Sequence, residues 1–80
     1  MNTVTAVRNR ILQLCNERNI TINALATISG LSPSYINNIL YGKSINPKII
    51  TIKMICDGLN ITLGEFFSTT EFNSLEQELK

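Results

Sequence analysis

The segment from Thr21 to Tyr41 constrains the fold more than any other part of the chain, because its apolar residues follow a helical period on both sides of one glycine. Gly30 can take positive φ without a Cβ clash, so one helix can end there and another can begin within a few residues. Ala26, four residues earlier, is small enough to let the two helices cross closely. The pattern predicts two short helices joined by a tight turn. The periodic positions are Ile22, Leu25, Ala26 and Ile28 before the glycine, and Ile36, Ile39 and Leu40 after it.

Helix starts are marked three times by the same arrangement: an apolar residue, then Thr or Ser, then a second apolar residue four positions further on. The hydroxyl can accept a hydrogen bond from the first turn, and the apolar pair fixes the direction in which the chain enters the helix. Pro33 is favoured at the first helical position, and Glu65 completes a capping box with Thr62. The three sets are Ile20, Thr21 and Leu25; Leu31, Ser32 and Ile36; and Ile61, Thr62 and Phe66.

The second helix of this pair would present an outer face without charge. Burial of its apolar positions leaves short or amide-bearing side chains and a tyrosine outside, whereas a solvated helix face usually carries Lys and Glu. An asparagine can form two hydrogen bonds with the edge of adenine in the major groove. We interpret this face as one that hydrogen-bonds to a flat partner. Its residues are Pro33, Ser34, Asn37, Asn38 and Tyr41.

An ordered set of residues along most of the chain resembles one known family. In this set the chain is similar to the Cro/repressor-type (Xre-like) helix-turn-helix regulators of bacteria and phages, over residues 5 to 67. It departs from the family at Ile22, where relatives often have a glutamine, at Leu40-Tyr41 and at Cys56. The resemblance implies an all-α, compact five-helix lambda-repressor-like DNA-binding domain at residues 1–67. The matching residues are Leu25-Ala26, Gly30, Ser32, Ile36, Gly42, Pro47 and the ending Leu59-x-Ile61-Thr62-Leu63-x-x-Phe66-Phe67.

Three other helices are expected to complete the domain. The first covers residues 3–18 and ends at Asn19, because asparagine tolerates the left-handed conformation. A fourth helix is expected to begin at Pro47, and a short fifth at Thr62. The expected buried positions are Val4, Val7, Ile11, Leu14 and Cys15 in the first helix, and Ile49, Ile52, Cys56 and Leu59 in the fourth.

DNA contacts are expected from the recognition helix, from the helix start before it and from the loop after it. The loop from Gly42 to Lys48 carries cations and small polar groups, which suit phosphate oxygens and carry no base information. An ordinary polar connection is the alternative. Base contacts are expected from Ser32, Pro33, Ser34, Asn37 and Asn38. Phosphate contacts are expected from Thr21, Asn23, Tyr35, Tyr41, Lys43, Ser44 and Lys48.

Residues 68–80 form a tail whose charge differs from that of the domain. Residues 1–67 carry six basic and three acidic side chains, a net +3, and the tail carries one basic and three acidic, a net −2. Apolar residues recur in the tail at helical spacing, and Ser68 and Glu71 are placed to cap a helix. The tail is a candidate dimerisation segment; the alternatives are a frayed end, or packing near Ile50 and Met54. The expected dimer contacts are Phe67, Phe72, Leu75 and Leu79.

Composition narrows the classes of function. The chain has no histidine, no glycine-rich phosphate loop and no recognisable nucleophile with a base, so we expect no enzyme, no metal and no cofactor. Cys15 and Cys56 are interpreted as two buried, reduced thiols. There is no apolar run of membrane-spanning length and no signal-peptide core, which predicts a cytoplasmic protein that does not bind membranes. No small-molecule ligand is evident.

These observations predict a sequence-specific DNA-binding transcriptional regulator, of the repressor kind, acting on double-stranded DNA. One recognition helix, at residues 33–41, reads only a few base pairs in the major groove. A homodimer on a two-fold operator would supply affinity and specificity together. The alternative is an adaptor of the same fold that binds protein, as an anti-repressor or a toxin partner, because the net charge is only +1 and the recognition face is uncharged.

Overall fold

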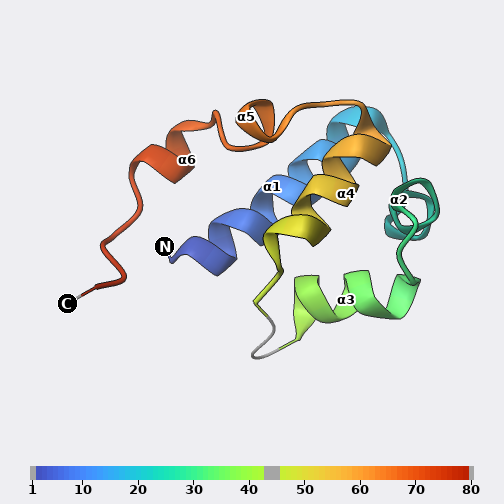
Figure 1. Cartoon of the computed structure of the whole chain (residues 1–80), viewed down its shortest axis with the longest axis horizontal. Helices are drawn as coiled ribbons and strands as arrows, with labels where there is room; N and C mark the ends of the chain where they lie inside the picture. Colours follow the sequence, from blue (N-terminus) through green and yellow to red (C-terminus); the bar gives the residue numbers. More distant parts are fainter. Residues whose placement is uncertain (1, 43–45, 80) are drawn as a thin grey trace.

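The structure, a computed structural model, describes residues 2–42 and 46–79 and contains only helices within those ranges. The helices are α1 (Thr3–Arg18), α2 (Ile22–Ser29), α3 (Pro33–Tyr41), α4 (Ile49–Leu59), α5 (Leu63–Phe66) and α6 (Thr70–Asn73). Figure 1 shows α3 and α5 at opposite ends of the molecule, with α1 and α4 between them. The expected all-α fold is confirmed, and the tail contributes the short sixth helix.

The starts of α2, α3 and α5 and the ends of α1 and α2 occur where the capping residues predicted them. Thr21 and Ser32 accept hydrogen bonds from the backbone N–H groups of the third residue beyond each, and Thr62 forms a reciprocal capping box with Glu65. Gly30 ends α2 with φ of 69°, in the left-handed region that is unfavourable for residues with a Cβ. Asn19 ends α1 with φ of 55°, as expected.

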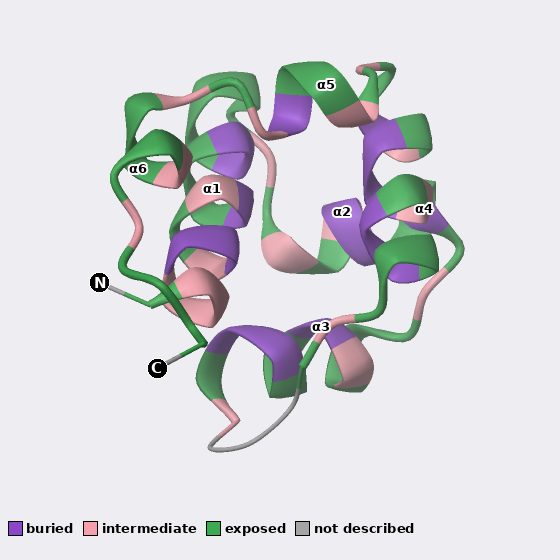
Figure 2. Ribbon diagram, turned by 60° about the vertical axis from the view of Figure 1, so that its left-hand side comes forward, coloured by how far each residue is buried: buried purple, intermediate pink, exposed green. Residues whose placement is uncertain are grey.

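The core lies between α1 and α4 and is closed at its two ends by α3 and α5. Figure 2 shows the buried faces of α1 and α4 turned toward each other across this core. Both cysteines are buried and free, and burial raises the pKa of each thiol, so both stay protonated at neutral pH. The fully buried large side chains are Phe66, Ile11, Leu25, Ile36, Ile39, Ile55, Leu59 and Cys56.

A close crossing of α2 and α4 holds the helix-turn-helix unit against the core, and it depends on Gly58. A Cβ at this position would lie 2.8 Å from the carbonyl oxygen of Ile28 and 2.9 Å from the hydroxyl of Ser29. Ser29 is buried, and its hydroxyl has no hydrogen-bond partner among the described residues. Ala26 was predicted from the sequence to allow the close approach between helices, whereas the role of Gly58 was not, because a glycine inside a helical pattern does not reveal which neighbour lies against it.

The buried side of α4 differs from the prediction at its start. The helix begins at Ile49 with Lys48 as N-cap, so Pro47 precedes the helix instead of opening it. Ile49 therefore occupies the first turn and is 62% exposed, and Thr51 and Ile55 are buried in addition to the predicted residues. Ile28 also lies outside the core, 49% exposed, because the buried face of α2 is formed by Leu25, Ala26 and Ser29, and position 28 falls off that face.

The tail packs on its own domain, beside α1. The ring of Phe72 lies 4.9 Å from that of Phe67 and 6.2 Å from that of Phe66, measured between centroids. Further on, Glu78 accepts hydrogen bonds from the backbone N–H and the hydroxyl of Thr3, at the start of α1. Packing near Ile50 and Met54 was therefore the wrong alternative. Helix α6 starts after Thr69, so the predicted cap at Ser68 is also wrong.

The tail does not continue as one helix, since α6 ends at Asn73. Phe72 and Leu75 are half-buried, whereas Leu79 is 88% exposed. The expected apolar stripe is thus divided between residues that cover the core and one that faces outward. None of the helices in the described ranges combines the length and apolar character needed to cross a membrane.

Candidate nucleic-acid interface

Helix α3 has one buried and one exposed side. Ile36, Ile39 and Leu40 are buried in the core. The opposite side presents Ser34, Asn37, Asn38 and Tyr41, all exposed, with Ser32 and Pro33 exposed at its start. All five residues predicted to touch bases are therefore exposed at the outer side of this helix or at its start. We call the surface formed by these five residues and Tyr41 the α3 face.

The two asparagines of the α3 face differ in their hydrogen bonds. The side-chain amide of Asn37 donates to the carbonyl oxygen of Pro33 at 2.9 Å, one turn earlier in the same helix. The Asn38 side chain makes no hydrogen bond with any residue that the structure describes. Its donor and acceptor groups are thus both available to a partner, which is the state needed for two hydrogen bonds to a base edge.

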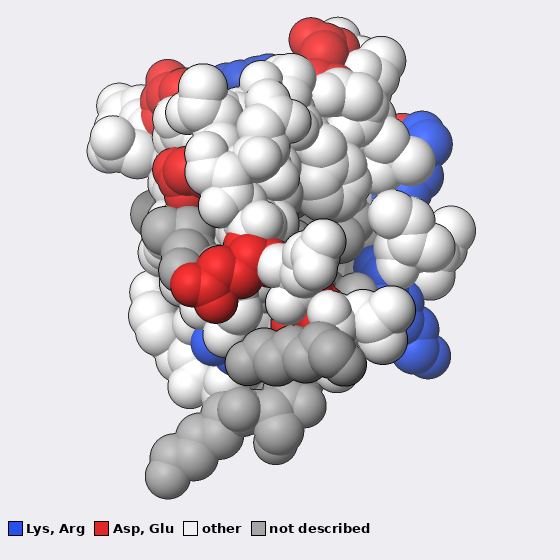
Figure 3. All heavy atoms as spheres, turned by 90° about the vertical axis from the view of Figure 1, so that its left-hand side faces the viewer, with Lys and Arg blue, Asp and Glu red and all other residues white. Residues whose placement is uncertain are grey.

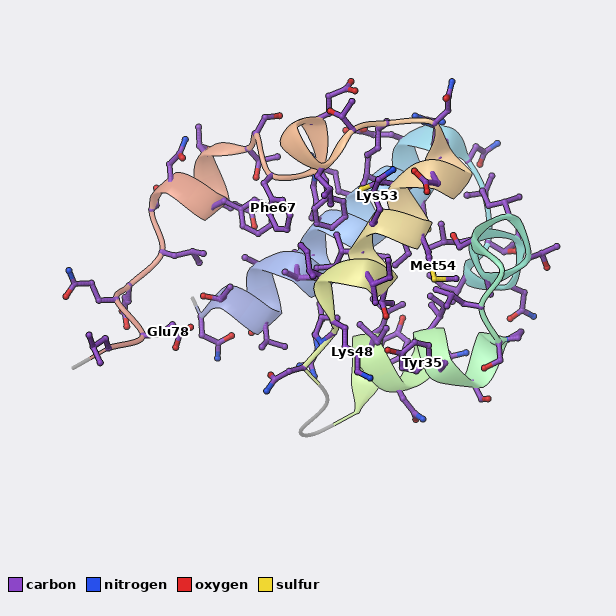
Figure 4. The ribbon with its side chains drawn as sticks, viewed as in Figure 1. Tyr35, Lys48, Lys53, Met54, Phe67 and Glu78 are labelled. Carbon is purple, nitrogen blue, oxygen red and sulfur yellow. The ribbon has the colours of Figure 1, made fainter. Side chains whose placement is uncertain are left out.

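Tyr35 lies at the border of the α3 face and holds α3 to α4. Its phenolic oxygen is 3.1 Å from the hydroxyl of Thr51, which is buried in α4, and the tyrosine itself is half-buried. Figure 4 shows the side chain in the space between the two helices. The predicted phosphate contact of Tyr35 would have to share the hydroxyl with this internal bond.

Lys48 stands at the N-cap of α4, where a lysine side chain does not stabilise the helix end. It makes no side-chain capping bond there, and its positive charge opposes the positive end of the helix dipole. The side chain is exposed. Lys53, further along the same helix, is paired with Asp57. Lys48 therefore has no ion-pair partner among the residues that the structure describes, and it stands at the start of α4, after the loop that follows α3.

The remaining predicted phosphate contacts fall into two groups. Thr21 caps α2, and Asn23 is exposed in the first turn of that helix. Tyr41 is 68% exposed at the end of α3. Lys43 and Ser44 lie outside the described residues. Residues 19–42 contain no charged side chain, so any cations for phosphate must come from segments beside the helix-turn-helix unit.

Arg8, which lies in α1, contacts the end of α3, and the sequence did not indicate this contact. Its Nε donates to the carbonyl oxygen of Ile39 at 2.7 Å, and its Nη2 donates to that of Gly42 at 2.5 Å. These carbonyls belong to the C-terminal end of α3, which has no basic residue in its own last turn. The one available signal was that missing charge, but sequence spacing did not indicate that α1 supplies it.

The family is decided by comparison of this chain with known domains. The model of the Cro/C1-type helix-turn-helix DNA-binding domain matches residues 10–71. The chain belongs to this family. This confirms the resemblance found in the sequence, and it supports a DNA-binding regulator rather than an enzyme.

One solved structure is similar over nearly the whole chain. The crystal structure of the prophage Lp1 protein 11 shares 34% sequence identity with a TM-score of 0.81. The alignment covers 94% of this chain and 100% of that protein. A search among curated proteins gave no match. The two proteins are thus similar in the arrangement of their helices, and the similarity includes most of the tail.

Proposed function

We propose that this protein is a sequence-specific transcriptional regulator of the repressor kind, which inserts α3 into the major groove of double-stranded DNA. The proposal includes a cytoplasmic homodimer on a two-fold operator, and it assigns the protein no catalytic activity. The Cro/C1-type family supports the class of function. The α3 face supports the choice of element, because it is exposed, lacks charge and, apart from Pro33, consists of side chains that hydrogen-bond.

The observation that carries the proposal is the contrast between Asn38 and two of its neighbours, Tyr35 and Asn37. Asn38 is exposed and has no internal hydrogen bond within the described residues, whereas Asn37 and Tyr35 each have one. The α3 face has no Arg or Lys, so the strongest contact to guanine is missing and A·T pairs should dominate the bases that it reads. Ser32, Pro33 and Ser34 would lie at the end of α3 that enters the groove.

Phosphate contacts are proposed to flank this face. Lys48, the N-terminal turn of α2 after Thr21, and the loop residues Lys43 and Ser44 would hold the backbone on either side. The poor cap at Lys48 supports this role, since a residue that breaks a local stability rule without compensation is more often kept for function. Asn23, Tyr35 and Tyr41 complete the proposed set.

The test begins with selection of bound duplexes from a random pool, which identifies the operator. Asn38→Ala should then weaken binding to the selected duplex by about 1–3 kcal/mol and leave binding to random duplex nearly unchanged. Asn73→Ala, in α6 at the other end of the chain, is the matched control and should change neither. Equal losses on selected and random DNA would refute base reading by Asn38.

Binding of a protein partner through the α3 face is the second candidate function, favoured by the absence of charge in residues 19–42. The two are distinguished by salt. A DNA-binding protein should bind any duplex at low ionic strength, and substitution of Lys43 and Lys48 should reduce the salt slope by about 0.9 for each lost contact. An adaptor would show no such binding, and failure of the wild-type protein to bind duplex DNA at low salt would favour it.

Dimer formation through the tail is proposed with Phe67, Phe72, Leu75 and Leu79 as contacts. The internal packing of Phe72 limits what a partner copy can touch to the outer sides of these residues and to Leu79. A two-fold operator needs two recognition helices about one turn of DNA apart, so pairing far from α3 is compatible with the geometry.

A further inference from the structure

Two arginines of α1 make the same kind of contact with different helices. Arg8 donates through Nε and Nη2 to the carbonyls of Ile39 and Gly42, at the end of α3. Arg10 donates through Nε and Nη2 to those of Phe66 and Glu65, at the end of α5, at 2.7 and 2.9 Å. Both side chains are half-buried. Helix α1 thus contacts both ends of the molecule, through Arg8 at α3 and through Arg10 at α5.

The carbonyls that Arg8 contacts are ones that α3 cannot satisfy itself. The last four carbonyls of an α-helix lack partners within the helix, and they form the negative end of its dipole. In α3 the N–H of Gly42 bonds to the carbonyl of Asn38, and Arg8 bonds to the next carbonyl, that of Ile39. The second bond of Arg8, to Gly42, fixes the residue from which the loop with Lys43 and Ser44 begins.

We propose that Arg8 is a positioning residue for DNA recognition, which sets the orientation of α3 and the start of the phosphate-contacting loop without reading bases itself. This rests on the proposed function of the α3 face. The Tyr35–Thr51 bond fixes the first turn of α3 to α4, and Arg8 fixes its last turn to α1. The recognition helix is therefore held at both ends by half-buried side chains that are not part of the α3 face.

A direct phosphate contact is the competing role for a cation at this place. The geometry favours positioning, because two branches of the guanidinium are already committed to carbonyls at 2.7 and 2.5 Å. A planar guanidinium can span two acceptors at fixed angles, whereas the ammonium of lysine acts as a point charge on a flexible stem. Arg8→Lys therefore keeps the charge and loses the fixed two-carbonyl contact, which separates the two roles.

The experiment compares Arg8→Lys and Arg8→Gln with Arg10→Lys and Arg10→Gln, using the full chain and only variants that stay folded by circular dichroism at the assay temperature. Amide hydrogen exchange without DNA gives the first result. Both Arg8 variants should accelerate exchange at residues 36–42, whereas the Arg10 variants should accelerate it at the end of α5 and leave residues 36–42 unchanged. Unchanged exchange at residues 36–42 in both Arg8 variants would overturn the proposal.

DNA binding gives the second result, with the selected operator and a random duplex as probes. Both Arg8 variants should lose about tenfold or more in affinity for the operator and much less for random duplex, so that the ratio of the two falls. Both Arg10 variants should keep that ratio. Wild-type behaviour of Arg8→Lys, together with a salt slope reduced by about 0.9 in Arg8→Gln alone, would overturn the proposal in favour of a direct phosphate contact.

Amide exchange and DNA binding together distinguish failure of the Arg8 proposal from failure of the proposed function. If the wild-type protein binds no duplex DNA, the proposed function fails, and a role of Arg8 in DNA recognition fails with it. The exchange measurement in that case still reports whether Arg8 orients α3. If the wild-type protein binds its operator and Arg8→Lys binds equally well with the same operator preference, only the positioning role fails.

Discussion

The end of the molecule formed by α3 and the end formed by α5 and α6 are attached to α1 by the same chemistry, yet they follow local stability rules to different degrees. At the α5 end, the helix start has a complete capping box, and three phenylalanine rings pack together. At the α3 end, α4 begins with a lysine that caps nothing, and Tyr41 and Ile49 are more than 60% exposed. The α5–α6 end also has a helix start without a side-chain cap, at Thr69, and the 88% exposed Leu79. The difference that remains is the cation at the start of α4, as expected where a polyanion binds.

Charge separates the same two regions. The face that carries the tail displays several acidic side chains, as Figure 3 shows, and basic side chains lie mostly at its edge. A polyanion would be repelled from that face and accepted more readily at the α3 end, where Lys48 has no acidic partner within the described ranges and residues 19–42 carry no acidic group. The difference supports DNA binding at one end of the molecule only.

The contrast between the two ends of the molecule requires that the tail packs on the folded core, and this requirement gives the largest predicted effect. Phe72→Ala removes a half-buried ring that packs against Phe67 and Phe66, and should lower the free energy of unfolding by about 1.5–3 kcal/mol. Leu79→Ala, at a residue that is 88% exposed, is the control and should leave monomer stability unchanged. Chemical denaturation at low protein concentration measures both. Equal stability of the two variants would mean that the tail does not pack on its own domain.

A second prediction applies one substitution to two helices, α4 and α5. Gly58→Ala places a methyl group within 3 Å of α2, and its clash of about 1–3 kcal/mol outweighs the gain in helix propensity of about 0.5–1 kcal/mol. Stability should therefore fall by about 1–2 kcal/mol. At Gly64 in α5 the added Cβ would come no closer than 3.7 Å to its nearest neighbour, so Gly64→Ala should be neutral or slightly stabilising. Thermal unfolding compares the two; a neutral Gly58→Ala would contradict the close crossing of α2 and α4.

The smallest predicted effect has opposite signs for stability and binding. Lys48→Ser supplies α4 with an N-cap hydroxyl and removes the unfavourable charge, which should raise the free energy of unfolding by about 0.5–1 kcal/mol. The same change should weaken binding to all duplexes alike and reduce the salt slope by about 0.9. Denaturation and salt-dependent binding are measured on the same sample. A variant that is more stable and binds with an unchanged slope would show that Lys48 does not contact phosphate.

The parts of the fold that could be predicted are those encoded by near neighbours in sequence. The caps at Thr21, Ser32 and Thr62, and the turn at Gly30, each depend on a few consecutive residues, and all occur as expected. The core positions of α3 and most of those of α1 followed from one helical period, although Val4 is only half-buried and Ala6 is buried in addition. At Ile49 the period gave the wrong answer: this residue is the first of α4 and is 62% exposed, and the buried positions of the helix start at Thr51.

The features that sequence could not supply are contacts between distant segments. Arg8 and Arg10 meet carbonyls 31 to 56 positions away along the chain, and backbone carbonyls leave no mark on sequence composition. Gly58 and Ile28 come together only through the crossing of α2 and α4. The route of the tail beside α1 depends likewise on Glu78 meeting Thr3. The composition of the α3 face was predictable, whereas the side chains that hold it in place were not.

The central claim is that DNA meets the α3 end and leaves the α5–α6 end free. It is tested most directly by titrating isotopically labelled protein with a short duplex at low ionic strength and following every backbone amide by NMR. The account predicts the largest chemical-shift changes in residues 21–24, 32–42 and 46–50, and small changes in residues 63–79. Largest changes in residues 63–79, or no changes at all, would contradict it.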